Sequence, residues 1–242
     1  MIEFDPIAVV RSCFTDKFGI PRQSGLVPAA RATLEFHPPY NNAQAFVGLE
    51  GCSHLWLQFV FHANRANGFR PRVRPPRLGG NKSLGVFATR SPVRPNPIGL
   101  SVVALEEVVI TGGTAALIVS GHDLLDGTPI LDVKPYVPYT DALTHAVNPV
   151  APAPPPTLPV RFSPRAAEQC QMHSSRTGCD LTALLTQLLA QDPRPQYQTP
   201  DPSRRYAMNL FDVDVAWHYW QQGGDYGIEV VSIDVAKDKN DP

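Results

Sequence analysis

The 242-residue sequence predicts a mainly β protein, an antiparallel barrel or sandwich followed by a small α+β domain. Two observations support this prediction. Runs of β-branched and aromatic residues, separated by Gly, Pro, Asn and Asp, fill the first 147 residues with little helical periodicity. A proline-rich segment then precedes a stretch whose hydrophobic pattern is helical. Many strands with few helices between them favour antiparallel packing over βαβ units.

Seven strands are expected before the proline-rich segment. The short helical pattern among them is NNAQAFVGLE, residues 41–50. The strands are expected at residues 7–12, 32–36, 54–63, 84–89, 100–110, 115–121 and 130–136.

The segment NPVAPAPPPTLP, residues 148–159, predicts a semi-rigid linker and a domain boundary. We therefore expect a barrel domain at 1–147 and an α+β domain at 160–242. In the latter, DLTALLTQLLAQ predicts a helix over 180–191 with Asp180 as its N-cap. The turn QQGGD joins two expected strands, 206–220 and 226–235, into a hairpin.

Charge is distributed unevenly along the chain. The net charge is only −1, yet no acidic residue occurs between Glu50 and Glu106, where eight positive residues lie. This pattern favours an anionic partner over the alternative of a solvated arginine-rich surface. The eight are Arg65, Arg70, Arg72, Arg74, Arg77, Lys82, Arg90 and Arg94.

Several common sites are absent from the sequence. No dinucleotide or P-loop glycine motif is present. His54 and His62 would share one face of a strand, but packing within a barrel is favoured over a metal site, so no metal is expected. No G-x-S-x-G motif marks a hydrolase nucleophile. The four cysteines lack C-x-x-C spacing, and no signal peptide or apolar span is seen, so a cytoplasmic protein is expected.

The stretch SPVRPNPIGLS, residues 91–101, predicts a stiff loop, because proline removes backbone donors and fixes φ. A stiff loop holding Arg94 and Asn96, with Arg90 just before it, suggests a binding site.

Five ordered stretches carry a resemblance to a known family. Together they resemble the TsaA-like family, specifically the TrmO-type tRNA methyltransferases, over nearly the whole chain. The stretches are FGIPRQSGL (18–26), PYNNAQAFVGLEGCSHLWLQFVFH (39–62), RPPRLGGNKSLGVFATRSPVRPNPIGLS (74–101), DLLDGTPILDVKPYVPY (123–139) and QDPRPQY (191–197). Ser24 departs from the family pattern, which has proline there.

The resemblance implies a barrel that binds S-adenosylmethionine, and a homodimer. The implied reaction methylates the exocyclic amine of threonylcarbamoyl-adenosine beside the anticodon of threonine-type tRNAs. The residues that would surround the donor are Gln23, Ser24, Gly25, Leu26, His62, Ala63, Arg90, Leu100, Ser120, Gly121, His122, Asp123 and Leu124. Arg90 would hold the donor carboxylate.

The acceptor would be a tRNA anticodon loop. Residues expected to contact it are Arg70, Arg72, Arg74, Arg77, Arg94, Asn96, Lys134 and Arg194. The alternative for RPRVRPPR is a dimer contact.

A general base would assist the reaction, and Asp126 and Asp192 are the carboxylate candidates, with Tyr197 as a partner. The alternatives are a turn at Asp126-Gly127 and a helix stop at Asp192-Pro193. Two other functions stay open, a non-catalytic RNA-binding barrel and a small-molecule sensor.

Overall fold

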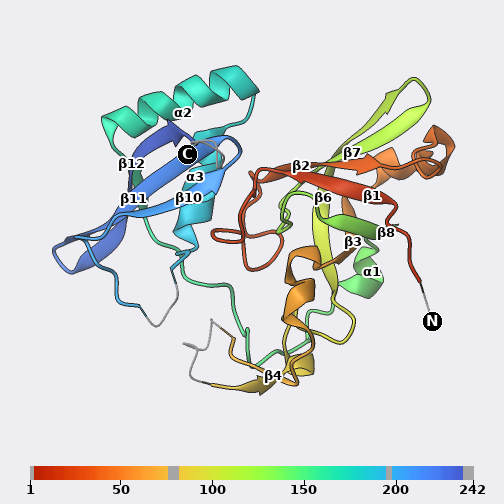
Figure 1. Ribbon diagram of the computed structural model, residues 1–242, viewed down its shortest axis with the longest axis horizontal. Coiled ribbons are helices and arrows are strands. Elements are labelled where there is room, and N and C mark those ends of the chain that lie inside the picture. Colours follow the sequence, from red (N-terminus) through yellow and green to blue (C-terminus); the bar gives the residue numbers. More distant parts are fainter. Residues whose placement is uncertain (1–2, 76–81, 195–197, 237–242) are drawn as a thin grey trace.

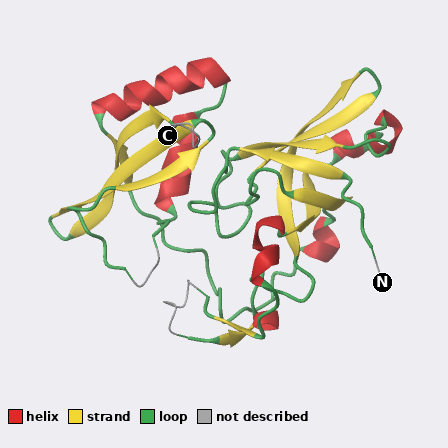
Figure 2. Cartoon of the chain, viewed as in Figure 1, coloured by secondary structure: helices red, strands yellow, loops and turns green. Residues whose placement is uncertain are grey.

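The computed structural model describes residues 3–75, 82–194 and 198–236. Its strands form a closed barrel, a separate four-stranded sheet and a two-stranded ribbon. Figure 1 shows the barrel and the C-terminal sheet on opposite sides of the molecule. Strands outnumber helices in both halves (Figure 2), which confirms the predicted mainly β class.

Six antiparallel strands close the barrel in the order β1–β2–β7–β6–β3–β8. Because β8 pairs with both β3 and β1, the sheet has no free edge, and the barrel alternative is confirmed over the sandwich. The strands are β1 (Ala8–Ser12), β2 (Arg31–Phe36), β3 (His54–Val60), β6 (Ile98–Thr111), β7 (Thr114–Ser120) and β8 (Pro129–Pro135).

Alternation along the strands builds the barrel core. In β3, Leu55 and Leu57 are buried while Trp56 between them is partly exposed, as the period of two requires. Leu34 and Leu117 from β2 and β7 fill the same interior. The strand side chains therefore form the stabilising core, and the loops at the barrel ends can carry binding residues.

The strand expected at 84–89 is mostly wrong. Only β5 (Leu84–Gly85) forms, paired with β4 (Arg72–Val73), and the 3-10 helix η5 (Val86–Ala88) follows at once. Arg94 Nη1 donates to the carbonyl oxygens of Val86 and Thr89 at 3.2 and 2.8 Å, which favours a turn here.

Two further predictions need correction. The strand expected at 54–63 stops at Val60, because the 3-10 helix η3 (His62–Asn67) begins two residues later. The helical pattern at 41–50 forms two 3-10 turns, η1 (Ala43–Phe46) and η2 (Leu49–Gly51), separated by Gly48 at φ 87°. A left-handed residue between the turns prevents a continuous helix.

The C-terminal sheet has the order β10–β11–β12–β9. Its strands are β9 (Val160–Phe162), β10 (Tyr206–Leu210), β11 (Val213–Gln222) and β12 (Asp225–Val235). Strand β9 pairs parallel to β12, a pairing that the sequence pattern did not predict.

Two helices accompany this sheet, and the short helix α1 (Pro138–Asp141) lies in the connection before it. The helix predicted at 180–191 is confirmed as α3 (Leu181–Ala190), whose N-cap Asp180 accepts a hydrogen bond from the Ala183 N–H at 2.9 Å. Helix α2 (Pro164–Thr177) was not predicted, because only three of its side chains are buried and its apolar stripe is short.

The strand expected at 206–220 is two strands. The chain turns back at Phe211 and Asp212, with Phe211 at φ 51°, so that Leu210 pairs with Val213. This turn lacks the glycine or Asn-Gly signal that normally marks a hairpin, which explains the error.

Residues 13–30, here named the bridging segment, leave the barrel and pack against the C-terminal sheet. Cys13, Phe14, Val27 and Ala30 belong to the same buried cluster as the leucines of α3 and Trp217 of β11. Hydrogen bonds reinforce the contact, among them the Phe211 N–H to the Cys13 carbonyl at 2.9 Å. The bridging segment is therefore held from both sides.

Candidate active site

A polar cavity of about 340 Å³ lies where the bridging segment meets one end of the barrel. Its volume falls in the range of small-molecule sites. Four parts of the barrel half contribute to it: the bridging segment, the end of β3, the loop before β6 with the start of β6, and the segment after β7. The lining residues are Pro21, Arg22, Gln23, Phe59, Phe61, Thr89, Arg90, Arg94, Ile98, Gly99, Leu100, Ser101 and Asp123.

Strands β3 and β6 fix one wall of the cavity. Phe59 lies opposite Gly99 in the antiparallel register, and its ring occupies the space of a side chain there. A Cβ added at Gly99 would lie 2.2 Å from Phe59 Cζ. The ring of Phe61 stands 5.1 Å from that of Phe59, edge to face, so the wall offers aromatic surface.

Arg90 and Gln23 join the loop before β6 to the bridging segment. Arg90 Nη1 donates to Gln23 Oε1 at 2.6 Å, and both residues line the cavity. Arg94 also lines it, although its Nη1 donates to the carbonyl oxygens of Val86 and Thr89. The stiff loop predicted from SPVRPNPIGLS thus brings two guanidinium groups to one cavity.

Asp123 provides the negative charge of the cavity. Its Oδ1 accepts a hydrogen bond from Ser101 Oγ at 2.6 Å. Burial raises the pKa of Asp123, against the lowering effects of the Ser101 hydrogen bond, nearby backbone N–H groups and the Arg90 charge. The carboxyl group of Asp123 is therefore largely shielded from water but surrounded by hydrogen-bond donors.

The two predicted donor segments meet directly. The Gly25 N–H donates to the Gly121 carbonyl at 2.7 Å, which places Ser24 and Leu26 beside the segment after β7. Gly121 has φ 71°, and its missing Cβ would lie 3.6 Å from Gly25 Cα. Glycine is favoured here because the backbone is left-handed, whereas a Cβ at this distance would make only an ordinary contact.

The neighbours of Asp123 face other surroundings. His122 is fully buried against Phe14, and burial lowers its pKa to about 4. Leu124 fills the barrel core, and Ser120 Oγ donates to Glu106. The side chains of Ser120, His122 and Leu124 support the segment after β7 and are not among the described residues that line the cavity.

His62, Ala63 and Leu100 flank the cavity. Leu100 lines it and is 48% exposed. His62 and Ala63 directly follow the lining residue Phe61, and the Ala63 carbonyl accepts from Lys17 Nζ at 2.7 Å. Their roles toward a donor stay predictions.

The predicted tRNA-contacting residues differ in their surroundings. Arg70, Arg72 and Arg74 are exposed, and Arg72 is oriented by hydrogen bonds to Ser83. Arg77 lies outside the described residues. Asn96 is exposed beside the cavity loop, whereas Lys134 forms an ion pair with Asp132 on the barrel wall.

Arg194 is buried, its side chain 10% exposed. It forms an ion pair with Asp192 at 3.0 Å, and its guanidinium lies 5.6 Å from the ring centre of Tyr219. Tyr219 in turn donates to Asp192 Oδ1 at 2.7 Å. These three side chains form one cluster, to which the DPRPQY motif contributes Asp192 and Arg194.

The predicted general bases have structural partners. Asp126 Oδ1 accepts from the Ser12 N–H at 2.9 Å, and Asp192, at φ 51°, belongs to the cluster with Arg194 and Tyr219. Neither is among the described residues that line the cavity. Tyr197 lies outside the described residues. Their catalytic roles stay predictions.

Sequence reasoning missed part of the cavity wall. Phe59, Phe61 and Ser101 were placed in strands without a role, and Arg22 was not singled out. The alternation of β3 and β6 marks which side chains point inward, but it does not say where the barrel interior opens. Arg22 Nη2 approaches the Arg194 carbonyl at 3.4 Å and links the cavity rim to the DPRPQY motif.

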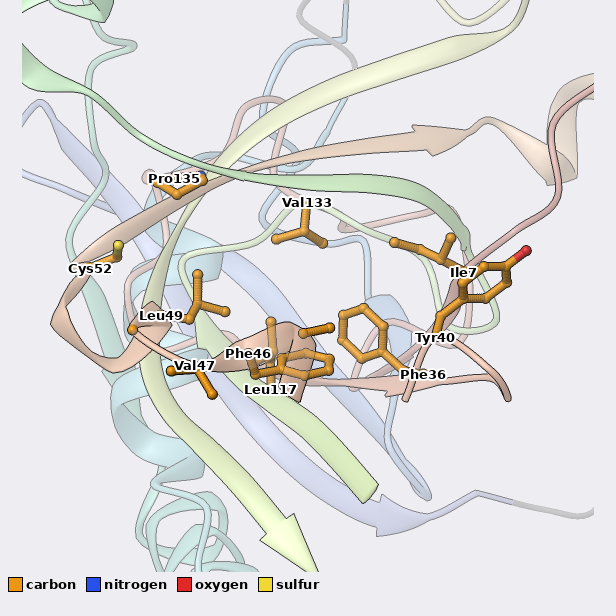
Figure 3. Close-up of a pocket in the computed structure, with 12 residues that line it drawn as sticks. Ile7, Phe36, Tyr40, Phe46, Val47, Leu49, Cys52, Leu117, Val133 and Pro135 are labelled. Carbon is orange, nitrogen blue, oxygen red and sulfur yellow. The ribbon is translucent and has the colours of Figure 1, made fainter. Parts of the chain in front are cut away.

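A second, larger cavity of about 530 Å³ lies at the other end of the barrel (Figure 3). The described residues around it are apolar except for Tyr40 and Cys52, and include Phe36, Phe46 and Val133. It offers no charged side chain among them and does not suit a charged ligand. No group of three or more potential metal ligands was found in the described parts of the chain.

Comparisons with known proteins agree with this architecture. Two family models match, the tRNA-methyltransferase O N-terminal domain over residues 9–142 and the TrmO C-terminal domain over residues 155–236. A tRNA (adenine(37)-N6)-methyltransferase of Escherichia coli is 44% identical over 234 residues, which is 96% of this chain and 97% of that protein.

Two further relatives extend the comparison. A Pseudomonas aeruginosa protein, RcsF, whose name assigns it provisionally to the S-adenosylmethionine-dependent methyltransferases, is 55% identical over 88% of this chain and 91% of its own length. A crystal structure of TrmO from P. aeruginosa superimposes with a TM-score of 0.81 at 45% identity, covering 98% of both chains. The chain belongs to the TrmO family of tRNA methyltransferases.

Proposed function

We propose that this protein transfers a methyl group from S-adenosylmethionine to the exocyclic amine of threonylcarbamoyl-adenosine next to the anticodon of tRNA. Its relatives are named tRNA (adenine(37)-N6)-methyltransferases, and the family model covers the barrel. The observation that carries the proposal is the polar cavity, which unites Gln23, Arg90 and Asp123 from three distant segments.

The residues of the cavity suit the donor chemically. The Arg90 guanidinium matches a carboxylate, the Phe59 and Phe61 rings offer a surface for an adenine, and Asp123 complements a sulfonium charge. The donor supplies an activated methyl group. The protein would hold the reacting atoms about 3–3.5 Å apart.

The acceptor would approach the polar cavity from the exposed side of the loop before β6. Arg70, Arg72 and Arg74 are exposed there and match the phosphates of an anticodon loop. Arg194 is paired with Asp192 and lies over the Tyr219 ring, so we assign it a structural role rather than a direct substrate contact.

We also propose a cytoplasmic homodimer with a barrel domain at 1–147 and a C-terminal domain at 160–242. Leu100, which lines the cavity, is 48% exposed, and Phe87, which lies beside the cavity residue Arg94, is 73% exposed, which supports an interface there. Among the described residues, no helix is long and apolar enough to cross a membrane. Sedimentation at micromolar concentration tests the dimer.

The decisive experiment is methyl transfer from labelled S-adenosylmethionine to bulk tRNA from cells with and without the threonylcarbamoyl modification. We expect label only in the modified tRNA. Label in both tRNAs would contradict the proposed acceptor. Donor binding without transfer to either tRNA would favour a non-catalytic barrel.

A further inference from the structure

We infer that Asp123 is the proton acceptor of the methyl-transfer reaction. This inference rests on the proposed function and adds a catalytic group to it. Among the described residues that line the polar cavity, Asp123 is the one carboxylate, and the other ionisable side chains there are the guanidinium groups of Arg22, Arg90 and Arg94. Guanidinium groups stay protonated and cannot accept a proton.

The reaction creates a need for such a group. As the bond from the acceptor nitrogen to the methyl carbon forms and the carbon–sulfur bond breaks, with its electron pair staying on sulfur, the nitrogen must lose its proton. The proton moves to a carboxylate oxygen of Asp123 and later to water. A ureido nitrogen is a poor nucleophile while it keeps its proton, so a positioned base lowers the barrier.

The hydrogen bonds of Asp123 leave room for this proton. Ser101 Oγ donates to Oδ1 at 2.6 Å, and the backbone N–H groups of Asp123 itself and of Ser24 also interact with the carboxylate. An ionised carboxylate has about four acceptor positions, so three donors leave one for an incoming proton. Because Ser101 is only 3% exposed, its side chain is fixed by packing, and its hydrogen bond orients the carboxylate.

The electrostatic surroundings make Asp123 a stronger base than an exposed aspartate. Burial raises the pKa of Asp123, while Arg90 keeps the ionised form accessible. Arg22 and Arg94 line the same cavity, and the adjacent His122 is neutral because burial lowers its pKa to about 4. A raised pKa makes the carboxylate a stronger base than one in water.

The other two carboxylate candidates are occupied elsewhere. Asp126 accepts from the Ser12 N–H in a turn, and Asp192 is paired with Arg194 and Tyr219. Asp123 differs from both because its carboxylate lines the cavity in which donor and acceptor would meet.

Asp123→Asn tests the inference, since asparagine keeps the shape and the acceptor for Ser101 but is not basic. We expect the single-turnover rate at saturating donor and tRNA to fall about 10²–10⁴-fold. The tRNA affinity by filter binding should stay within about threefold, and a loss of donor affinity from the missing charge beside the sulfonium does not enter a rate measured at saturating donor. Asp123→Glu should recover part of the rate. Glu35→Gln, an exposed carboxylate paired with Arg11, is the matched control and should be fully active.

A rate for Asp123→Asn within threefold of the wild type would overturn the inference. So would an unchanged saturating rate with a large loss of donor affinity, because Asp123 would then only hold the donor. A wild-type protein that methylates no tRNA would refute the proposed function itself, and the inference with it.

Ser101→Ala gives an independent test if Asp123→Asn does not fold. Removing the hydroxyl takes away a hydrogen bond that lowers the pKa of Asp123. The wild-type rate should rise with pH until Asp123 is ionised, and in Ser101→Ala this rise should move to higher pH. An unmoved profile would contradict the inference, because a purely structural serine would change the rate without moving the profile.

Discussion

The two cavities lie at opposite ends of one barrel and are built in different ways. Strand β3 runs from the apolar cavity, near Cys52, to the polar cavity, at Phe59. The apolar cavity is the larger, yet its walls are mostly side chains of the barrel and its turns. The polar cavity takes charged groups from loops far apart in sequence. Size therefore does not identify the functional site, whereas converging charges do.

The largest effect is expected from Leu117→Ala at the apolar end. Leu117 is fully buried and lines the apolar cavity, so its truncation should cost about 2–5 kcal/mol of unfolding free energy. Donor affinity of the folded protein should not change. Urea unfolding and calorimetry measure the two quantities. Ile118→Ala, on the outward face of the same strand and half-buried, should cost less. A loss of donor affinity in Leu117→Ala would break the comparison.

His122 should make the polar end sensitive to acid. Its pKa is lowered to about 4 by burial, so between the ordinary value of 6.5 and about 4 the unfolded chain binds a proton that the native protein does not. The contribution of His122 to the free energy of unfolding is therefore complete above pH 6.5, and about 3 kcal/mol of it is lost as the pH drops to 4. Urea unfolding from pH 7.5 to 4 measures this loss.

His122→Gln should lose this part of the pH dependence, whereas His145→Gln, at an exposed position, should keep it. If His122→Gln showed the same slope as the wild type, acid sensitivity would have to be assigned to other groups.

Arg90→Ala should weaken donor binding with little effect on folding. A hydrogen bond to a charged group contributes about 1.5–3 kcal/mol, which corresponds to roughly a ten- to hundredfold rise in the donor Kd. Calorimetry with S-adenosylmethionine measures it. Arg11→Ala, which removes an exposed ion pair with Glu35, is the control. An unchanged Kd in Arg90→Ala would show that the polar cavity does not hold the donor carboxylate.

Arg72→Ala and Arg74→Ala should have the smallest effect. Each removal of a phosphate contact should lower the salt dependence of tRNA binding by about one in the slope of log K against log salt. Filter binding at several salt concentrations gives the slope, and donor affinity should be unaffected. A slope equal to that of the wild type would favour the alternative that this segment is a dimer contact.

Much of this protein could be predicted from local sequence. Alternating hydrophobic residues gave six barrel strands, and the leucine stripe behind Asp180 gave α3, because burial of one face follows directly from periodicity. The prolines of residues 91–101 predicted a stiff loop and a binding site at Arg90 and Arg94. The split of residues 206–220 at Phe211 was hidden, because its left-handed backbone is imposed by packing rather than by a glycine.

The family resemblance already grouped Gln23, Arg90 and Asp123 around the donor, but only the tertiary structure decided the contacts among them and added further cavity residues such as Ser101. Arg90 meets Gln23 across 67 positions of sequence, and Ser101 meets Asp123 across the barrel end. Likewise, the structure pairs Arg194 with Asp192 beside Tyr219, whereas the sequence offered these two residues as a substrate contact and a general base. Sequence patterns report the environment of a residue through its neighbours in the chain. The partners of a charged side chain depend on contacts between residues that are far apart in the chain. The sequence therefore identified candidate site residues but could not predict the hydrogen bonds between them.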